Sequence, residues 1–160
     1  MRKESSMKTR LSILAICLVS LAAFAAEQTD FSGTWDFNTE KSKNIGMMAQ
    51  MKMSLAIQQS DTALDITTHS TYQGKDRDSK THFDLTGSPV TNESPMGGPN
   101  ETVSKWDGGK LVTTWTGESA VAGKKTVRTE TRSLSADAKV LTVESVRGSN
   151  PPLVMVFDKK

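Results

Sequence analysis

Two histidines are the first side chains in this sequence whose type and spacing could do chemistry. His69 and His82 are the only histidines of the chain. If the segments 63–73 and 77–86 pair as a hairpin that turns at 74–77, the two imidazoles lie directly opposite each other, as two ligands of a metal ion would. In that register they point outward, and no third ligand is close. We therefore expect a solvated pair and no bound metal.

Four methionines follow one another closely between residues 47 and 53. Thioethers are soft ligands, so Met47, Met48, Met51 and Met53 could hold Cu(I). Methionine is also a flexible apolar filler of irregular gaps. We favour the second interpretation, in which the cluster lies at the edge of a binding cavity and also contacts the ligand.

Charged residues alternate along a third segment, at Arg128, Glu130 and Arg132. Residues 127, 129 and 131 between them are Val, Thr and Thr, and we expect these to face the interior and the charges to face solvent. With the opposite orientation, both arginines would point inward and could clamp a carboxylate. The Tyr72 hydroxyl could then add a hydrogen bond.

Motifs of catalysis are missing from the sequence. There is no nucleophile elbow, no H-E-x-x-H and no glycine-rich phosphate loop. Pairs of catalytic carboxylates stay open, since Asp and Glu are plentiful. We expect a binding protein rather than an enzyme, with no cofactor.

The first 25 residues have the pattern of an export signal. Residues 1–10 carry four basic side chains, residues 11–26 carry no charge, and Ala23-Phe24-Ala25 is an A-x-A cleavage site. We predict a signal peptide over 1–25 and a mature domain over 26–160, periplasmic or secreted, with no transmembrane segment after cleavage. A retained anchor or a lipid on Cys17 are the alternatives.

Removal of the signal changes the charge and the thiol content. The whole chain has a formal charge of +2, and residues 1–25 carry four of its basic and one of its acidic groups, so the remainder is −1. No basic stripe is left, which argues against nucleic acid as a partner. The only cysteine, Cys17, is lost with the signal, so no disulfide is expected and the fold depends on its core.

The rest of the chain alternates apolar and polar residues with a period of two, which is the pattern of β-strands. Turn residues separate the segments. The connection 39–50 has room for a short helix or lid, whereas 87–100 is rich in Pro and Gly and is expected to be irregular. The nine predicted strands are 31–38, 51–59, 63–73, 77–86, 101–106, 110–117, 124–134, 139–147 and 152–159.

Pairing of the predicted strands places apolar residues on one face. In the hairpin described above, Ile66 faces Leu85, Thr68 faces Phe83 and Tyr72 faces Ser79. Small hydroxyl side chains interrupt the inner faces, which suits a barrel around a cavity better than a packed sandwich. We predict an all-β antiparallel up-and-down meander, closed into a barrel of about eight or nine strands. The inner hydroxyl residues are Thr68, Ser70, Thr81, Thr113, Thr129 and Thr131.

Two motifs resemble those of a known family. Gly33-Thr34-Trp35 on the first strand resembles the G-x-W signature of lipocalins and the wider calycin group, and Lys105-Trp106-Asp107-Gly108 resembles a hairpin of small exported lipocalin-like proteins from bacteria. The resemblance implies an open barrel that binds a small, often apolar ligand. It also implies that Trp35 closes one end and stacks with a basic residue, here Lys159 or Arg147, and that inward arginines would clamp a carboxylate as in intracellular calycins.

From these observations we predict a monomeric exported protein that holds a small hydrophobic or amphipathic molecule. The alternative is a protein-binding or inhibitor-type barrel that acts through loops 39–50 and 87–100. The expected ligand-binding residues are Phe37, Met53, Leu55, Tyr72, Phe83, Trp115 and Phe157.

Overall fold

The computed structural model describes residues 28–93 and 98–160, and the predicted signal peptide lies outside them. These residues form one antiparallel sheet of ten strands in the order β4-β3-β2-β1-β10-β9-β8-β7-β6-β5. The strands are β1 (Gly33–Phe37), β2 (Lys52–Gln59), β3 (Ala63–Tyr72), β4 (Lys75–Asp84), β5 (Val90–Glu93), β6 (Pro99–Asp107), β7 (Lys110–Glu118), β8 (Lys125–Leu134), β9 (Val140–Val146) and β10 (Leu153–Lys159). A 3₁₀-helix, η1 (Gly46–Gln50), precedes β2.

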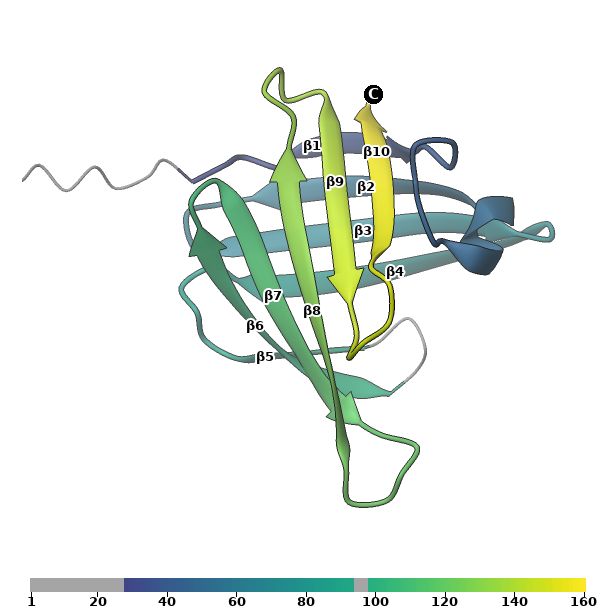
Figure 1. Cartoon of the computed structure of the whole chain (residues 1–160). Helices are drawn as coiled ribbons and strands as arrows, with labels where there is room; N and C mark the ends of the chain where they lie inside the picture. The colour runs from purple at the N-terminus through teal and green to yellow at the C-terminus, as the bar shows by residue number, and fades with distance from the viewer. Residues whose placement is uncertain (1–27, 94–97) are drawn as a thin grey trace, which may run out of the picture.

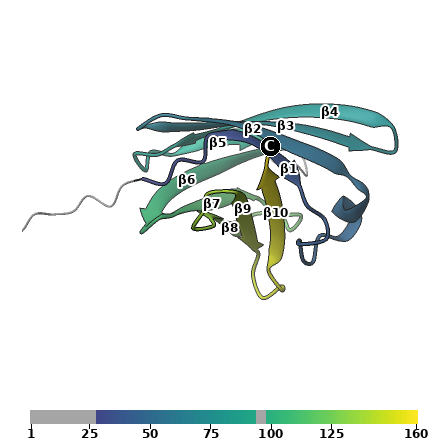
Figure 2. The same cartoon turned by 90° about the horizontal axis from the view of Figure 1, so that it is seen from above.

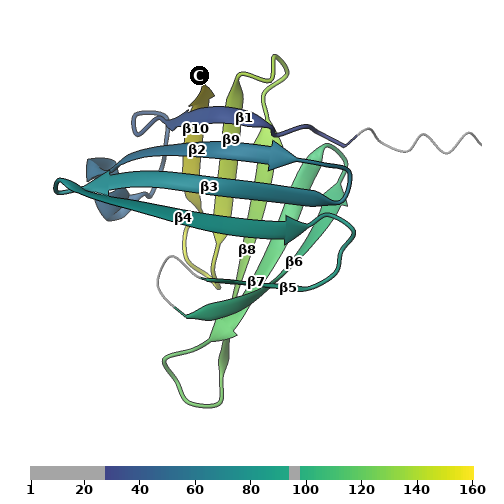
Figure 3. The ribbon, with the colours of Figure 1, turned by 180° about the vertical axis from the view of Figure 1, so that it is seen from behind.

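The sheet folds over on itself into a nearly closed barrel. Strands β1–β4 form one layer, and β6–β10 form a second layer that crosses it steeply (Figures 1 and 2). The layers join where β1 pairs with β10. The two ends of the sheet, β4 and β5, come together on the opposite side (Figure 3). The predicted all-β barrel is confirmed, and its nine predicted strands are all present.

Alternating apolar residues build the core on the inner faces of both layers. A buried Leu or Phe removes enough apolar surface from water to contribute roughly 1.5–3 kcal/mol. Phe31 and Trp35 are fully buried at one end of the barrel, and there Phe31 stacks on Trp106 with ring centroids 6.0 Å apart. The members of the core are Phe31, Trp35, Leu55, Ile57, Leu64, Ile66, Phe83, Leu85, Leu111, Trp115, Leu141, Val143 and Phe157.

Trp35 closes this end, as predicted, and Gly33 leaves room for Lys159 to reach the tryptophan ring. The indole Nε1 donates to the carbonyl of Phe31 at 3.0 Å, and Nζ of Lys159 lies 5.2 Å from the ring centroid. Gly33 has φ +133°, and a Cβ there would lie 3.1 Å from Cε of Lys159. Of the two predicted stacking partners, Lys159 is therefore the one that the fold brings to the tryptophan.

The predicted register of the β3–β4 hairpin is wrong. The turn is the two residues Gln73 and Gly74, with φ of 50° and 74°, so that Tyr72 pairs with Lys75 and not with Ser79. A tight two-residue hairpin turn requires positive φ at both positions. Glutamine is not a typical residue at the first of them, so the sequence did not indicate this turn. The shift is four residues, so the inner face is unchanged. The correct pairs include Ile66 with Thr81, Thr68 with Ser79 and Leu64 with Phe83.

A further strand lies within the connection 87–100, which was expected to be irregular. Strand β5 pairs with β6 and carries Asn92, whose side chain is buried. The Asn92 amide accepts from the His82 N–H at 3.0 Å and donates to the His82 carbonyl at 2.7 Å. It therefore replaces a backbone strand residue at the seam between β4 and β5. Nδ2 also donates to Oγ1 of Thr102 at 2.9 Å.

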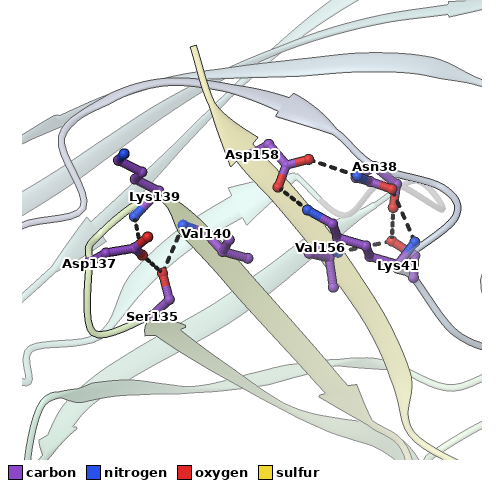
Figure 4. A network of polar contacts seen from close by, with 9 residues as sticks. Asn38, Lys41, Ser135, Asp137, Lys139, Val140, Val156 and Asp158 are labelled. Atoms are coloured by element: carbon purple, nitrogen blue, oxygen red, sulfur yellow. Dashed lines mark hydrogen bonds and ion pairs between the residues drawn. The ribbon is translucent and has the colours of Figure 1, made fainter.

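A polar network fastens the corner before η1 to the last strand. Asp158 on β10 accepts from Nδ2 of Asn38 at 2.7 Å and from Nζ of Lys41 at 2.8 Å (Figure 4). Oγ of Ser42 accepts from the N–H of Val156 at 2.9 Å, and Lys43 pairs with Val154. These contacts fix the start of the segment that carries η1.

The β8–β9 turn is also built from side-chain hydrogen bonds. Oγ of Ser135 donates to Asp137 at 2.6 Å, and the N–H groups of Lys139 and Val140 donate to Asp137 and Ser135 (Figure 4). This turn separates two of the predicted strands, as the turn residues between the predicted segments indicated.

Candidate functional site

We call the end of the barrel opposite Trp35 the mouth, and the connections 43–51, 72–75 and 147–152 lie at this end. Asn44 donates to the carbonyl of Pro152 at 2.7 Å, which joins two of these segments. Helix η1 occupies the end of the connection 39–50, which had room for a short helix or lid. A hollow of about 500 Å³ lies beside η1. Its lining residues are Asp36, Phe37, Thr39, Ala49, Gln50, Met51, Lys52 and Met53.

The predicted ligand-binding residues fall into two groups. Leu55, Phe83, Trp115 and Phe157 are buried members of the core. Phe37, Met53 and Tyr72 are half-buried at or near the mouth, on the same inner faces. Contacts connect some of them across the two groups: Phe37 lies 5.2 Å from Phe157 between ring centroids, while Phe83 meets Trp115 edge-on at 5.6 Å within the core. The set therefore runs from the mouth into the core, and Phe37 and Met53 line the hollow.

The predicted orientation of β8 is wrong, and the charged residues face inward. Glu130 and Arg132 are 5% and 6% exposed, whereas Val127 is 51% exposed. The reason is register: β7 and β8 pair so that Arg128 lies directly opposite Trp115. Directly opposed residues share a face of the sheet, so a buried Trp115 requires an inward Arg128. No signal within β8 itself could have found the inward arginines, because only the pairing with β7 decides which face of β8 is buried.

Each of the two arginines stacks on an aromatic ring. The Arg128 guanidinium lies 4.5 Å from the centroid of the Trp115 ring, and that of Arg132 lies 4.6 Å from the centroid of Phe83. Because Trp115 and Phe83 contact each other, the four side chains form one connected stack. Stacking on aromatic faces is a favourable way to hold a partly desolvated guanidinium.

Glu130 lies between the arginines and pairs with both. Its Oε1 contacts Nη2 of Arg132, and its Oε2 lies 3.6 Å from Nη2 of Arg128. Burial lowers the pKa of Arg128, the carboxylate of Glu130 partly restores it, and the nearby Arg147 and Arg132 lower it further. The ordinary pKa of arginine is so high that the group stays charged at neutral pH.

Two donors of this stack lack an acceptor. Nη1 of Arg132 and Nε1 of Trp115 are buried and have no hydrogen-bond partner among the residues that the structure describes. A buried donor without a partner costs about 1–3 kcal/mol. Both residues lie on the inner face of the barrel.

The two histidines do not face each other, which corrects the predicted pair. Nδ1 of His69 lies 2.7 Å from Asp78, and Nδ1 of His82 lies 2.7 Å from Asp65, all on the exposed outer face. The cause is the four-residue shift of the hairpin. Within 28–93 and 98–160, no group of three His, Cys, Asp or Glu residues could hold a metal ion.

The methionines lie at the mouth, as the favoured interpretation expected. Met47 and Met48 belong to η1, and Met51 ends it. Met51 and Met53 line the hollow, and Met53 also packs against the core. Met47 is 75% exposed, so it is free to contact a molecule that arrives from outside.

A second hollow lies at the opposite end of the barrel. It has a volume of about 520 Å³ and is open to solvent, and Oγ1 of Thr29 donates to the carbonyl of Gly109 at 2.6 Å beside it. Of its lining residues, only Leu134 packs against the core. Its lining residues are Thr29, Asp30, Gly109, Lys110, Ser133, Leu134, Ser135 and Ala138.

Comparison with known proteins gives similarity in structure alone. No family model matches the sequence, and no curated protein matches it significantly. The REP1-NXSQ fatty acid transporter superposes with a TM-score of 0.65 at 13% identity, over 82% of this chain and 96% of that one. Human cRBP IV gives 0.63 at 19% identity, over 82% and 99%. A fatty-acid-binding protein from brain tissue of Drosophila melanogaster gives 0.61 at 20% identity, over 81% and 99%.

The chain has the barrel fold of these proteins. At such identities the likeness extends to the fold alone, and it agrees with the predicted antiparallel β-barrel. Within the described part of this barrel fold, no helix has the length and apolar character needed to cross a membrane.

Proposed function

We propose that this protein binds a small apolar or amphipathic molecule in the barrel, with the acidic group of the molecule near the arginines of β8. The observation that carries the proposal is the inward Arg128 and Arg132 beside the buried Trp115. Guanidinium groups bind carboxylates well, and the single carboxylate of Glu130 compensates only one of the two positive charges inside the barrel.

The shape and chemistry of the mouth support the same proposal. Phe37 and Met53 give the hollow an apolar wall, and further along the inner face Thr68 and Ser70 are half-buried hydroxyl groups. An apolar site with a few polar groups is typical of small-molecule binding. The proteins of similar fold include a fatty acid transporter and fatty-acid-binding proteins, which is consistent with an apolar ligand. The proposed contacts are the predicted set, Phe37, Met53, Leu55, Tyr72, Phe83, Trp115 and Phe157.

Titration with dodecanoic acid tests the proposal. We expect the acid to change the fluorescence of Trp115, and native mass spectrometry to show one bound molecule per chain. Trp35 and Trp106 lie near the other end, so Trp115→Phe should remove most of the change. A chain that shows neither a bound mass nor a fluorescence change with the acid or with dodecanol would contradict the proposal.

Export is part of the proposed role. The pattern of residues 1–25 supports it, since a basic segment, an apolar run and an A-x-A site are what a signal peptidase requires. Expression of the full chain in a bacterium, followed by the intact mass of the product, tests this. Loss of residues 1–25 together with a periplasmic location is the expected result, and an uncut cytoplasmic product would contradict it.

A protein-binding role is the second candidate, and one observation favours it. Met47 on η1 is 75% exposed within segment 39–50, and large apolar side chains with this exposure are common in contacts between proteins. If a protein is the partner, Met47→Ser should weaken its capture without changing the affinity for dodecanoic acid.

A further inference from the structure

The charged row on β8, formed by Arg128, Glu130 and Arg132, contains an acid as well as two bases. Glu130 is the one buried carboxylate among the residues that the structure describes. Replacing a buried ionic cluster with apolar residues is often neutral or favourable for stability, so stability alone does not explain its presence. Its position between the two guanidiniums suggests a role in what they bind.

The charge of the row follows from its three members. Two guanidiniums and one carboxylate leave a net charge of +1 on the inner face. The carboxylate contacts Nη2 of Arg132 and approaches Nη2 of Arg128, while Nη1 of Arg132 has no partner. The carboxylate of Glu130 therefore compensates the charge of one arginine. The remaining positive charge and the unpaired donor of Arg132 match a ligand group with one negative charge.

The surroundings of these three side chains strengthen their electrostatic interactions. Arg132 and Glu130 are more than nine-tenths buried, and the rings of Phe83 and Trp115 cover the guanidiniums. In such a place water screens charge weakly, so one extra negative charge interacts strongly with Glu130. Arg128 is less enclosed, with 19% of its side chain exposed.

We propose that Glu130 sets the charge selectivity of the barrel: it neutralises one of the two inward arginines and restricts the site to amphipathic molecules whose head group carries one negative charge. This rests on the proposed function and deepens it. Nη1 of Arg132 and Nε1 of Trp115 are the donors that face such a head group, and Glu130 repels a head group with two charges.

The test compares three probes that share one alkyl chain: dodecanol, dodecanoic acid and dodecyl phosphate. At pH 7 the phosphate head carries about 1.5–2 negative charges. We expect the wild-type protein to bind the acid more tightly than either of the others. Glu130→Gln should tighten dodecanoate by about tenfold and dodecyl phosphate by more, since a buried negative charge is gone. The affinity for dodecanol should not change.

Two further variants complete the design. Arg128→Gln removes the more exposed cation and should weaken dodecanoate by about tenfold, again with dodecanol unchanged. Glu144→Gln removes an exposed carboxylate of β9 and should change nothing. Glu130→Gln leaves two arginines without their counter-charge and is expected to be less stable, so binding is measured well below its unfolding temperature. If it does not fold, the wild-type preference order and Arg128→Gln still decide.

The outcomes separate the two proposals. The charge-selectivity proposal is overturned if dodecanol binds as tightly as the acid. It is also overturned if the affinity for dodecanoate is the same in wild type, Glu130→Gln and Arg128→Gln. Either result leaves small-molecule binding intact. Absence of binding for all three probes overturns both.

Discussion

At the scale of single residues, Arg132 shows how a buried charge depends on its partners. Its guanidinium lies on Phe83 and contacts Glu130, and both charged groups are removed from water. Removing one member of a buried pair strands the other, whereas removing both lets apolar packing replace the pair.

We therefore expect Arg132→Met to lower the free energy of unfolding by about 3–5 kcal/mol, because Glu130 loses its nearest cation. The double change Glu130→Leu with Arg132→Met should recover most of the loss. Urea denaturation followed by tryptophan fluorescence measures both. Equal losses in the single and the double variant would show that the pair is not what the mutation disturbs.

Gly33 belongs to the same scale. Gly33→Ala should destabilise the protein by about 1–3 kcal/mol, because φ +133° disfavours any Cβ and the new atom crowds Lys159. The neighbouring Thr34→Ala should stay within about 0.5 kcal/mol of wild type. Thermal unfolding compares the two, and similar values for both would contradict the role assigned to the glycine.

At the scale of elements, the corner between β1 and η1 depends on one carboxylate of β10. Hydrogen bonds from Asn38 and Lys41, together with the positive charge of Lys41, hold the pKa of Asp158 below its ordinary value. The network therefore strengthens where the carboxylate is ionised. The network links the position of segment 39–50 to the last strand, β10.

A pH prediction follows for this carboxylate. A lowered folded pKa gives stability that is present above the unfolded pKa, about 3.9, and is lost as the pH falls through the folded value. Asp158→Asn should thus be less stable than wild type at neutral pH, and the difference should shrink in acid. Unfolding temperatures measured from neutral pH into acid test this. A difference that does not change with pH would mean that ionisation of Asp158 contributes nothing.

At the scale of the whole molecule, closure of the barrel depends on the seam between β4 and β5. Asn92 makes hydrogen bonds to both backbone groups of His82 there. The rest of β4, from Lys75 to Lys80, is an edge with exposed charged residues such as Asp76 and Arg77. Charges on an edge strand discourage pairing with another chain, which is useful for a sheet that does not close completely.

Asn92→Ala should open the seam. We expect a loss of about 1–3 kcal/mol, because the two backbone groups of His82 lose their partners, and faster amide hydrogen exchange in β4 and β5. Thr91→Ala, an exposed neighbour on the same strand, serves as the control. Faster exchange spread evenly over the barrel, or no loss of stability, would contradict a local role at the seam.

The sequence by itself determined the strands, the inner faces of most of them and the barrel, since alternation with period two is a local property of a strand with one buried face. The resemblance to lipocalins left Lys159 and Arg147 as possible partners of Trp35, and the fold brings Lys159 to it. Tertiary structure decided three things: the turn at Gln73–Gly74, strand β5, and the inward direction of Arg128 and Arg132. The reason is that threonines and charged residues alternate along β8, so both faces of this strand are polar and its sequence does not show which face is buried. Only pairing with its neighbour, here Arg128 opposite Trp115, chooses which face is buried.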